Sequence, residues 1–325
     1  MNDQTAHTIA AALQPKPESC NFDLDHALSS VVSVQTKIPS NGYTVQALGA
    51  DRAGHGVVIS DTGLVLTIGY LVVEADTVWL VNHSGQAVPG HVAAYDQETG
   101  FGLVQALGHL ETPAIPIGSA KTIQIGDPVI LAGHGGRTNA ITAILADKRE
   151  FAGYWEYLLD EALFTEPPHP FWGGGALLDI EGKLCGIGSL FIQKNPDEFG
   201  SFEGNMVVPI DILLPIIDDL QLFGRVQRPA RPWIGALSTE AEDRIIVINT
   251  WDGGPAAEAG LEAGDLVLAV NGESVTSLAQ FYRRVWALGD AGTKVPLDII
   301  RSGRLAEVTI QSADRAAFYL APKIH

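Results

Sequence analysis

The chain has 325 residues, enough for about two or three domains of ordinary size. Apolar residues make up 46% of it and charged residues 18%, a composition that can build cores and is not that of a disordered protein. The formal net charge is −18, which argues against binding to nucleic acid, because a phosphate backbone needs a basic face.

The start of the chain and its cysteines bear on the compartment. The N-terminal stretch MNDQTAHTIAAALQPKPESC has neither the basic region nor the long apolar core of a secretory signal. We find no apolar run of about 18 residues that predicts a membrane span. Cys20 lies in a polar segment and Cys185 in an apolar strand, so we expect no disulfide. These features predict a cytoplasmic protein that contacts no membrane.

The first two thirds of the chain have the pattern of a β domain. Residues 1–21 are polar and contain prolines, and we expect a flexible tail there. From residue 22 to 224, short apolar runs alternate with turn signals. The segment 54–68 predicts a hairpin around Asp61-Thr62-Gly63, and 78–96 predicts another. Many short strands with little helix are typical of an all-β barrel or sandwich.

A helix, a linker and a second domain follow. Isoleucines and leucines recur at helical spacing between 212 and 220, which predicts a helix that closes the first domain. Residues 225–232, RVQRPARP, are basic and proline-rich, so we expect a linker. Residues 233–325 predict a second, α+β domain with strands and one helix. The strands are expected at 244–250, 266–270 and 295–302, and the helix at 277–288.

The second domain contains the most specific motif of the sequence. The stretch GGPAAEAGLEAGDLVLAVNGESV, residues 253–275, follows the pattern xSPAAxAGLxxGDxIxxxNGxxV of PDZ domains. Over residues 24–312 the chain resembles the HtrA/Deg family of serine proteases. The resemblance implies a mainly β fold, a trypsin-like double β-barrel followed by an α+β PDZ domain.

The resemblance fails at each position of the catalytic triad. The family's histidine segment, LTNxHVVxxAD, reads LTIGYLVVEAD here, with Tyr70 in place of histidine. The aspartate segment, DPxTDLAVL, reads DQETGFGLV, with Gly100 in place of aspartate. The serine segment, NPGNSGGPL, reads HPFWGGGAL. There Gly173 replaces the serine, Trp172 the preceding asparagine and Phe171 the oxyanion-hole glycine.

These replacements remove the chemistry of a serine protease. Such an enzyme needs a hydroxyl nucleophile, a base near it and a group that orients the base. Gly173 and Gly100 supply no side chain, and the usual pKa of tyrosine, near 10, makes Tyr70 a poor base. We therefore expect no catalytic residues and no enzyme activity. The alternative, which the family implies, is an active trypsin-like serine endopeptidase.

Other residues offer weaker candidates for chemistry. His134 and His169 could form a metal pair, as could His83 and His91, but two histidines without a third ligand are weak evidence. We expect neither a metal nor another cofactor. Cys185 could be proposed as a nucleophile, although a small thiol in an apolar strand is usually a core residue.

Aromatic residues gather in the same segments. Phe171 and Trp172 share one loop, the resemblance places Tyr70 near them, and residues 154–157, YWEY, lie in the region before that loop. Two interpretations remain open. The rings fill the space that a triad vacated, or they form an exposed patch that binds a protein.

In the PDZ domain, the resemblance implies a groove that binds the C-terminus of a partner. The segment Trp233-Ile234-Gly235-Ala236 matches the loop x-Φ-G-Φ, whose amides hold the terminal carboxylate. Phe281, Tyr282 and Val285, in the helix near Leu278, are candidates for the apolar pocket. The alternative is a PDZ domain that only packs against its own chain or a neighbouring subunit.

The sequence thus predicts an inactive, HtrA-like protein that binds proteins or peptides as a scaffold, an adaptor or a chaperone-like subunit. The alternative without peptide binding is a purely structural subunit of a larger complex. Family resemblance makes a homo-oligomer, a trimer, the expected assembly.

Overall fold

The structure, a computed structural model, describes residues 9–193 and 203–321. It is mainly β, as the sequence predicts, and divides into two compact units. The first unit holds the chain up to Arg149, residues 161–226 and the segment from Leu320 onward. The second unit holds residues 150–160 and 227–319. A short segment from the middle of the chain therefore belongs to the C-terminal unit.

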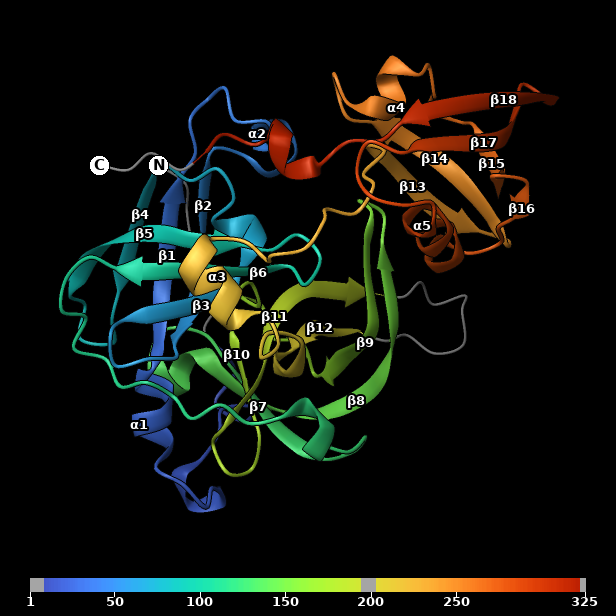
Figure 1. Cartoon of the computed structure of the whole chain (residues 1–325). Coiled ribbons are helices and arrows are strands. Elements are labelled where there is room, and N and C mark those ends of the chain that lie inside the picture. Colours follow the sequence, from blue (N-terminus) through green and yellow to red (C-terminus); the bar gives the residue numbers. More distant parts are fainter. Residues whose placement is uncertain (1–8, 194–202, 322–325) are drawn as a thin grey trace, which may run out of the picture. The chain divides into compact units, whose positions relative to one another are not determined.

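The first unit begins with a closed β-barrel, drawn in blue and cyan in Figure 1. Its strand order is β1-β2-β3-β6-β5-β4, all in antiparallel pairs. The strands are β1 (Val31–Lys37), β2 (Asp51–Val58), β3 (Leu64–Ile68), β4 (Thr77–Val81), β5 (Ala87–Tyr95) and β6 (Phe101–Ala106). Every residue of β3 is buried, because this strand pairs with β2 and β6 and is covered on both faces.

A second closed barrel follows, in the order β10-β11-β12-β9-β8-β7. Its strands are β7 (Pro128–Ala132), β8 (Ala140–Gly153), β9 (Tyr157–Glu166), β10 (Ala176–Leu178), β11 (Leu184–Gln193) and β12 (Glu203–Pro209). The core contains Leu131, Ile141, Leu163 and Val207, all buried. The expected barrel or sandwich is thus a pair of barrels, because each six-stranded sheet closes on itself.

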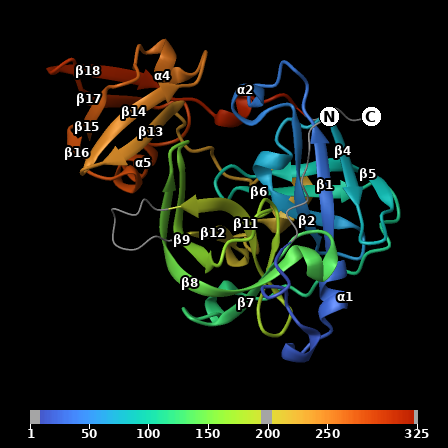
Figure 2. The same ribbon diagram turned by 180° about the vertical axis from the view of Figure 1, so that it is seen from behind.

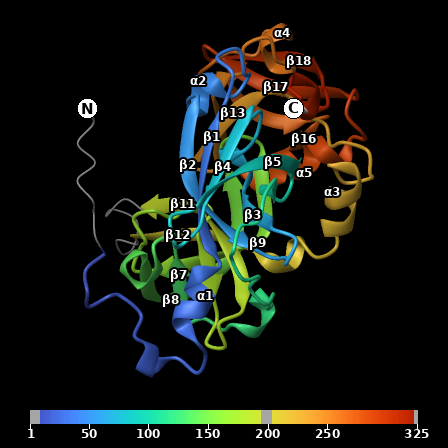
Figure 3. The same cartoon turned by 90° about the vertical axis from the view of Figure 1, so that its left-hand side faces the viewer.

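Two expectations for the first unit are corrected. The predicted closing helix is two pieces, the 3-10 turn η5 (Ile210–Ile212) and α3 (Ile217–Phe223), because Pro215 between them lacks an N–H and restricts the residue before it. Of the predicted flexible tail, residues 1–8 lie outside the described residues. The rest lies beside the second barrel (Figure 3) and is held at some points. Ile9 is buried in the core of that barrel and Thr142 donates to the carbonyl of Leu13 at 2.8 Å, whereas residues 10–13 and 16–19 are exposed.

The second unit is a sheet with a helix beside it, shown from behind in Figure 2. The sheet order is β13-β14-β15-β17-β18, and β16 pairs with β15. The strands are β13 (Ala236–Ala241), β14 (Arg244–Thr250), β15 (Leu266–Val270), β16 (Glu273–Ser274), β17 (Lys294–Arg301) and β18 (Arg304–Gln311). Helix α5 (Leu278–Ala287) begins at Ser277, whose hydroxyl accepts from the N–H of Gln280.

Short helices connect these elements. They are η1 (Pro17–Ser19), α1 (Leu24–Ser29), α2 (Val45–Leu48), η2 (Gly69–Leu71), η3 (Ala120–Thr122), η4 (Gly136–Asn139), α4 (Pro255–Glu258) and η6 (Arg315–Phe318). Within the described part of the chain, no helix has both the length and the apolar character needed to cross a membrane. The predicted linker packs on the second unit, since Ala291 donates to the carbonyl of Ala230 at 2.9 Å.

Candidate functional site

Two of the three triad positions meet in the first unit. Tyr70 lies in η2, directly after β3, and its hydroxyl donates to the carbonyl of Ser189 at 2.9 Å. A Cβ placed on Gly173 would lie only 2.7 Å from the Tyr70 hydroxyl oxygen. The tyrosine therefore occupies the space that a side chain at position 173 would need.

The third position, Gly100, reaches the same place through its backbone. Its carbonyl accepts from the N–H of Gly69, the neighbour of Tyr70, at 2.7 Å. Gly100 has φ of +81°, a left-handed conformation that glycine adopts without strain and other residues adopt at a cost. The local turn is thus built for glycine and offers no carboxylate to orient a base.

The phenol of Tyr70 is held in its protonated form. Burial raises its pKa above the ordinary value, and a hydrogen bond with the side chain of Trp172 only partly opposes this. A protonated phenol that already donates to Ser189 cannot accept a proton from a nucleophile. This arrangement positions a donor where a serine protease positions a base.

In the loop that the resemblance aligns with an oxyanion hole, the N–H of Phe171 is already used in a hydrogen bond. The N–H of Phe171 donates to Nδ1 of His169 at 2.9 Å. An oxyanion hole needs backbone N–H groups that aim at the reacting oxygen. The donor at position 171 instead serves a buried imidazole, and the Trp172 ring packs on Phe191 with centroids 5.6 Å apart.

His169 is fixed as a neutral structural residue. It is fully buried, its N–H donates to Asn205 Oδ1 at 2.6 Å, and its Nε2 faces the carbonyl of Asn139 at 3.0 Å. Because Nδ1 accepts from Phe171, the proton lies on Nε2 and is donated to that carbonyl. Burial lowers the pKa of His169, which keeps the ring uncharged.

Sequence reasoning gave no role to His55, which completes this backbone network. Its Nδ1 accepts from the N–H of His134 at 3.1 Å, and its own N–H donates to the carbonyl of Gly173 at 2.8 Å. Burial, with added repulsion from His169 and His134, lowers its pKa to about 3. His55 thus ties the loop of Gly173 to the loop that contains His134.

The alternative chemistries from the sequence find no support in these contacts. The ring of His134 faces the carbonyl of Asn82, 2.9 Å from Nε2. Across the residues that the structure describes, no three His, Cys, Asp or Glu side chains are placed to hold a metal ion, and this includes His83 and His91. Cys185 is fully buried, and burial raises the pKa of its thiol to about 12, which is too high for a nucleophile.

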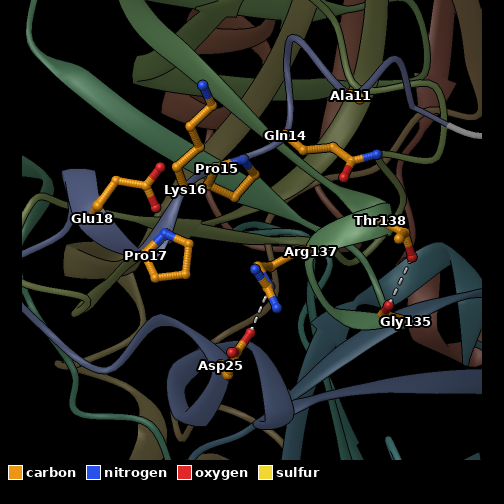
Figure 4. A pocket seen from close by; sticks show the side chains of 10 residues that line it. All are labelled: Ala11, Gln14, Pro15, Lys16, Pro17, Glu18, Asp25, Gly135, Arg137 and Thr138. Atoms are coloured by element: carbon orange, nitrogen blue, oxygen red, sulfur yellow. Dashed lines mark hydrogen bonds and ion pairs between the residues drawn. The ribbon is translucent and has the colours of Figure 1, made fainter.

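A polar pocket lies elsewhere on the first unit, between the N-terminal segment and the loop at η4 (Figure 4). Across it, Arg137 pairs with Asp25 at 2.9 Å, and both side chains are about half exposed. The remaining lining includes Gln14, Lys16 and Glu18. None of the triad positions lines this pocket, and an exposed ion pair gives it no reactive group.

In the second unit, the expected carboxylate-binding loop is formed. The N–H groups of Ile234, Gly235 and Ala236 converge on a single carboxylate, that of Glu156, at 3.1, 2.7 and 3.0 Å. Gly235 has φ of +76°, which allows the three donors to point to one side. Glu156 was noted in the sequence only as a member of the YWEY run.

The predicted pocket residues on α5 do not line an open pocket. Phe281, Tyr282 and Val285 are at most 1% exposed and belong to the core of the second unit. That core includes Leu158 of the β8–β9 hairpin as well as the apolar face of this amphipathic helix, so a role of the three side chains as a pocket for an external peptide stays a prediction. The hydroxyl of Tyr282 donates to the carbonyl of Gly153 at 2.8 Å.

The aromatic residues form two groups, one in each unit. In the first unit, Trp172 contacts Phe191, and Phe171 is 43% exposed. In the second unit, Trp155 stacks on Tyr157 with centroids 5.6 Å apart. The YWEY run therefore has ring partners of its own within the second unit.

Comparison with known proteins agrees with this architecture. Residues 54–187 match the family described as trypsin-like peptidase domain, and residues 232–311 match the PDZ domain family. A probable periplasmic serine endoprotease DegP-like of Pseudomonas putida is 25% identical over 279 residues, which cover 80% of this chain and 56% of that protein. Serine endoprotease DegS of Haemophilus influenzae is 26% identical over 272 residues, with coverage of 81% and 77%.

Solved structures give the same fold. The HtrA-type protease AlgW with decapeptide superposes with a TM-score of 0.53 at 19% identity, over 90% of this chain and 97% of that one. A serine endoprotease from Yersinia pestis gives 0.51 at 25% identity, over 89% and 95%. The chain spans about half the length of the DegP-like relatives that it matches. The expectation of a cytoplasmic protein is contradicted, because these DegP-like relatives are named periplasmic.

Proposed function

We propose that this chain, a trypsin-like peptidase domain followed by a PDZ domain of the HtrA/DegP type, is a catalytically inactive member of that group that binds proteins. The observation that carries this proposal is the contact between positions 70 and 173. The hydroxyl of Tyr70 fills the place of a nucleophilic side chain, and its pKa is raised, so the site has neither an attacking group nor a base.

The oxyanion loop supports the same conclusion independently of the triad. Because the Phe171 N–H donates to buried His169, it is not aimed at a substrate carbonyl. A site that lost only its triad could retain residual catalysis through the oxyanion hole. Here one N–H of the loop, that of Phe171, is already engaged with His169, which weakens that second contribution.

The binding role rests on the PDZ domain. A chain-end carboxylate is captured by backbone N–H groups, and the second unit presents three of them together, from Ile234 to Ala236. The AlgW structures, similar in fold, are titled as complexes with peptides. The ligand class proposed for this chain is therefore a protein or peptide with a free C-terminus. A homo-oligomer stays a prediction from resemblance.

The competing function is an active serine endopeptidase, favoured by the names of the relatives. The test is incubation of the full chain with fluorescein-labelled casein and, separately, with a fluorophosphonate probe for reactive serines, with trypsin as positive control. We expect no cleavage and no labelling. Cleavage that survives repurification and is abolished by Tyr70→Phe would overturn the proposal, because it would assign chemistry to the phenol.

A further inference from the structure

A segment of the chain itself binds the loop Ile234–Ala236 of the second unit. The segment is the tip of the β8–β9 hairpin, which belongs to the second unit and reaches β13 in Figure 1. At its end, the carboxylate of Glu156 takes all three N–H donors of the loop Ile234–Ala236. Glu156 is only 7% exposed, so its carboxylate is enclosed rather than resting on a surface.

The backbone next to Glu156 also bonds to β13, as the backbone of a bound peptide would. Ser238 of β13 donates its N–H to the carbonyl of Tyr154 at 2.9 Å. Ala236 donates to Glu156, and Ser238, two residues later in β13, donates to Tyr154, two residues earlier in the hairpin. The spacing of this one backbone bond and one side-chain bond is that of an extended peptide placed antiparallel to a sheet edge.

Further contacts hold the hairpin in place from both sides. The hydroxyl of Tyr282 donates to the carbonyl of Gly153, and Arg315 donates to the carbonyl of Trp155 at 2.9 Å. Leu158 is buried in the same core as Tyr282. Arg283 on α5 makes ion pairs with Glu150 and Asp160 at the two sides of the hairpin. The groove is therefore filled from its carboxylate loop to its helix.

Glu156 pays a conformational cost for this position. Its φ is +58°, in the left-handed region that a side chain other than glycine, asparagine or aspartate seldom adopts. Such strain persists where surrounding contacts outweigh it and concentrates at functional sites. A free C-terminus reaches the same three donors without a left-handed turn, which gives an external ligand an advantage over the hairpin.

We propose that the tip of the β8–β9 hairpin, Gly153–Glu156, is an internal ligand of the PDZ groove, and that a partner's C-terminus binds only by displacing it. This inference rests on the proposed peptide-binding function. Because the hairpin is tethered, its effective concentration is high and weak peptides are excluded. The partner is then a protein whose free C-terminus competes for Ile234–Ala236 and pairs with β13.

The first experiment tests occupancy without any ligand. Hydrogen exchange of the full chain is compared for the wild type, Glu156→Ala, the milder Glu156→Gln and the matched control Glu161→Gln, an exposed carboxylate on the same hairpin. We expect amide exchange at Ile234–Ala236 to rise about tenfold or more in Glu156→Ala, less in Glu156→Gln, and not in the control. Unchanged exchange in both Glu156 variants would overturn the proposal.

The second experiment tests displacement. An array of synthetic nonapeptides with varied apolar C-termini is probed with the four proteins, and the strongest binder is measured by fluorescence polarisation, both as free acid and as C-terminal amide. We expect Glu156→Ala to bind the free acid about tenfold or more tightly than the wild type does, and the amide to bind neither protein. Equal affinity of wild type and Glu156→Ala for the free acid would overturn the proposal that the peptide must displace the hairpin.

The two outcomes separate this inference from the function beneath it. Faster exchange at Ile234–Ala236 with no peptide captured by any variant would support the internal ligand and refute external peptide binding. Peptide binding that is equal in all four proteins would support the proposed function and refute the internal ligand.

Discussion

The contact between Tyr70 and Gly173 predicts a measurable coupling between the two positions. In the wild type, a Cβ at 173 would lie 2.7 Å from the Tyr70 hydroxyl oxygen, far inside normal contact. Gly173→Ala should therefore destabilise the first unit by about 1–3 kcal/mol, the usual cost of overpacking. The same Cβ lies 3.7 Å from the Tyr70 Cζ, which is an ordinary contact once the hydroxyl is gone.

Removal of the hydroxyl has its own cost but relieves the clash. Tyr70→Phe leaves the carbonyl of Ser189 without its donor, so we expect a loss of about 1 kcal/mol. In the double variant, alanine at 173 no longer meets an oxygen. The double variant should therefore be about 1–2 kcal/mol more stable than the sum of the single effects predicts.

The assay is thermal unfolding of the full chain for the four proteins of the cycle. For a unit of about 200 residues, 1 kcal/mol corresponds to about 2–4 °C in Tm. The control pairs Tyr70→Phe with Gly85→Ala, a glycine whose Cβ would meet nothing within 4 Å; its φ of +84° gives alanine a backbone cost of its own, which should simply add to the effect of Tyr70→Phe. Additive effects of Tyr70→Phe and Gly173→Ala would show that the two positions do not touch, and would remove the main support for a filled nucleophile site.

Three further predictions follow from the described contacts. Tyr70→His, Gly100→Asp and Gly173→Ser combined should give no measurable casein cleavage, because the N–H of Phe171 remains bound to His169; efficient cleavage would show a working oxyanion hole. Cys185 should react with a thiol reagent only after unfolding, since burial raises its pKa to about 12, and labelling of the native protein at this residue would contradict that. Peptide affinity of the wild type should rise from pH 5 to pH 8, by at most about 100-fold, whereas that of Glu156→Gln should stay level. Burial raises the pKa of Glu156 to about 7, and the N–H of Ile234 and the charge of Arg315 oppose this rise. Between pH 5 and pH 7 the docked hairpin therefore holds a proton on Glu156 that the released hairpin has lost. Docking of the hairpin weakens as the pH rises through this range, which frees the loop for the peptide. Tyr282 also faces Glu156, but its pKa is raised and it stays neutral throughout. An affinity that falls from pH 5 to pH 8 in the wild type would contradict the direction.

The sequence predicted those parts of the fold that depend on local pattern. Alternating apolar runs and turn signals indicated the hairpins of both barrels, and the 253–275 motif indicated the second unit. The prediction failed where long-range contacts decide. Ile9 lies in a polar, proline-containing stretch, and only the second barrel, far along the chain, provides the core that buries it.

The candidate site divides in the same way. The proposed replacement of the triad at Tyr70, Gly100 and Gly173 rests on comparison with the family motifs alone. The destination of the Phe171 N–H could not be found in this way, because it depends on His169, whose ring contacts the carbonyl of Asn139 and whose backbone N–H donates to Asn205, both from other segments. The pocket predicted at Phe281 and Val285 stays a prediction, because an amphipathic helix has the same spacing whether its apolar face meets a ligand or a sheet.

Glu156 shows why the groove's occupant escaped sequence reasoning. In YWEY it has no motif, since one acidic residue in a turn is ordinary and its left-handed φ cannot be read from its type. Its role arises from three N–H groups about 80 residues later in the chain. Under the two proposals, the two sites have changed in a related way: Tyr70 takes the place of a nucleophile in one, and Glu156 the place of a ligand in the other. An inert barrel that kept an open PDZ groove would bind any suitable C-terminus continuously, whereas a groove filled by its own chain makes binding conditional on a partner that outcompetes Glu156.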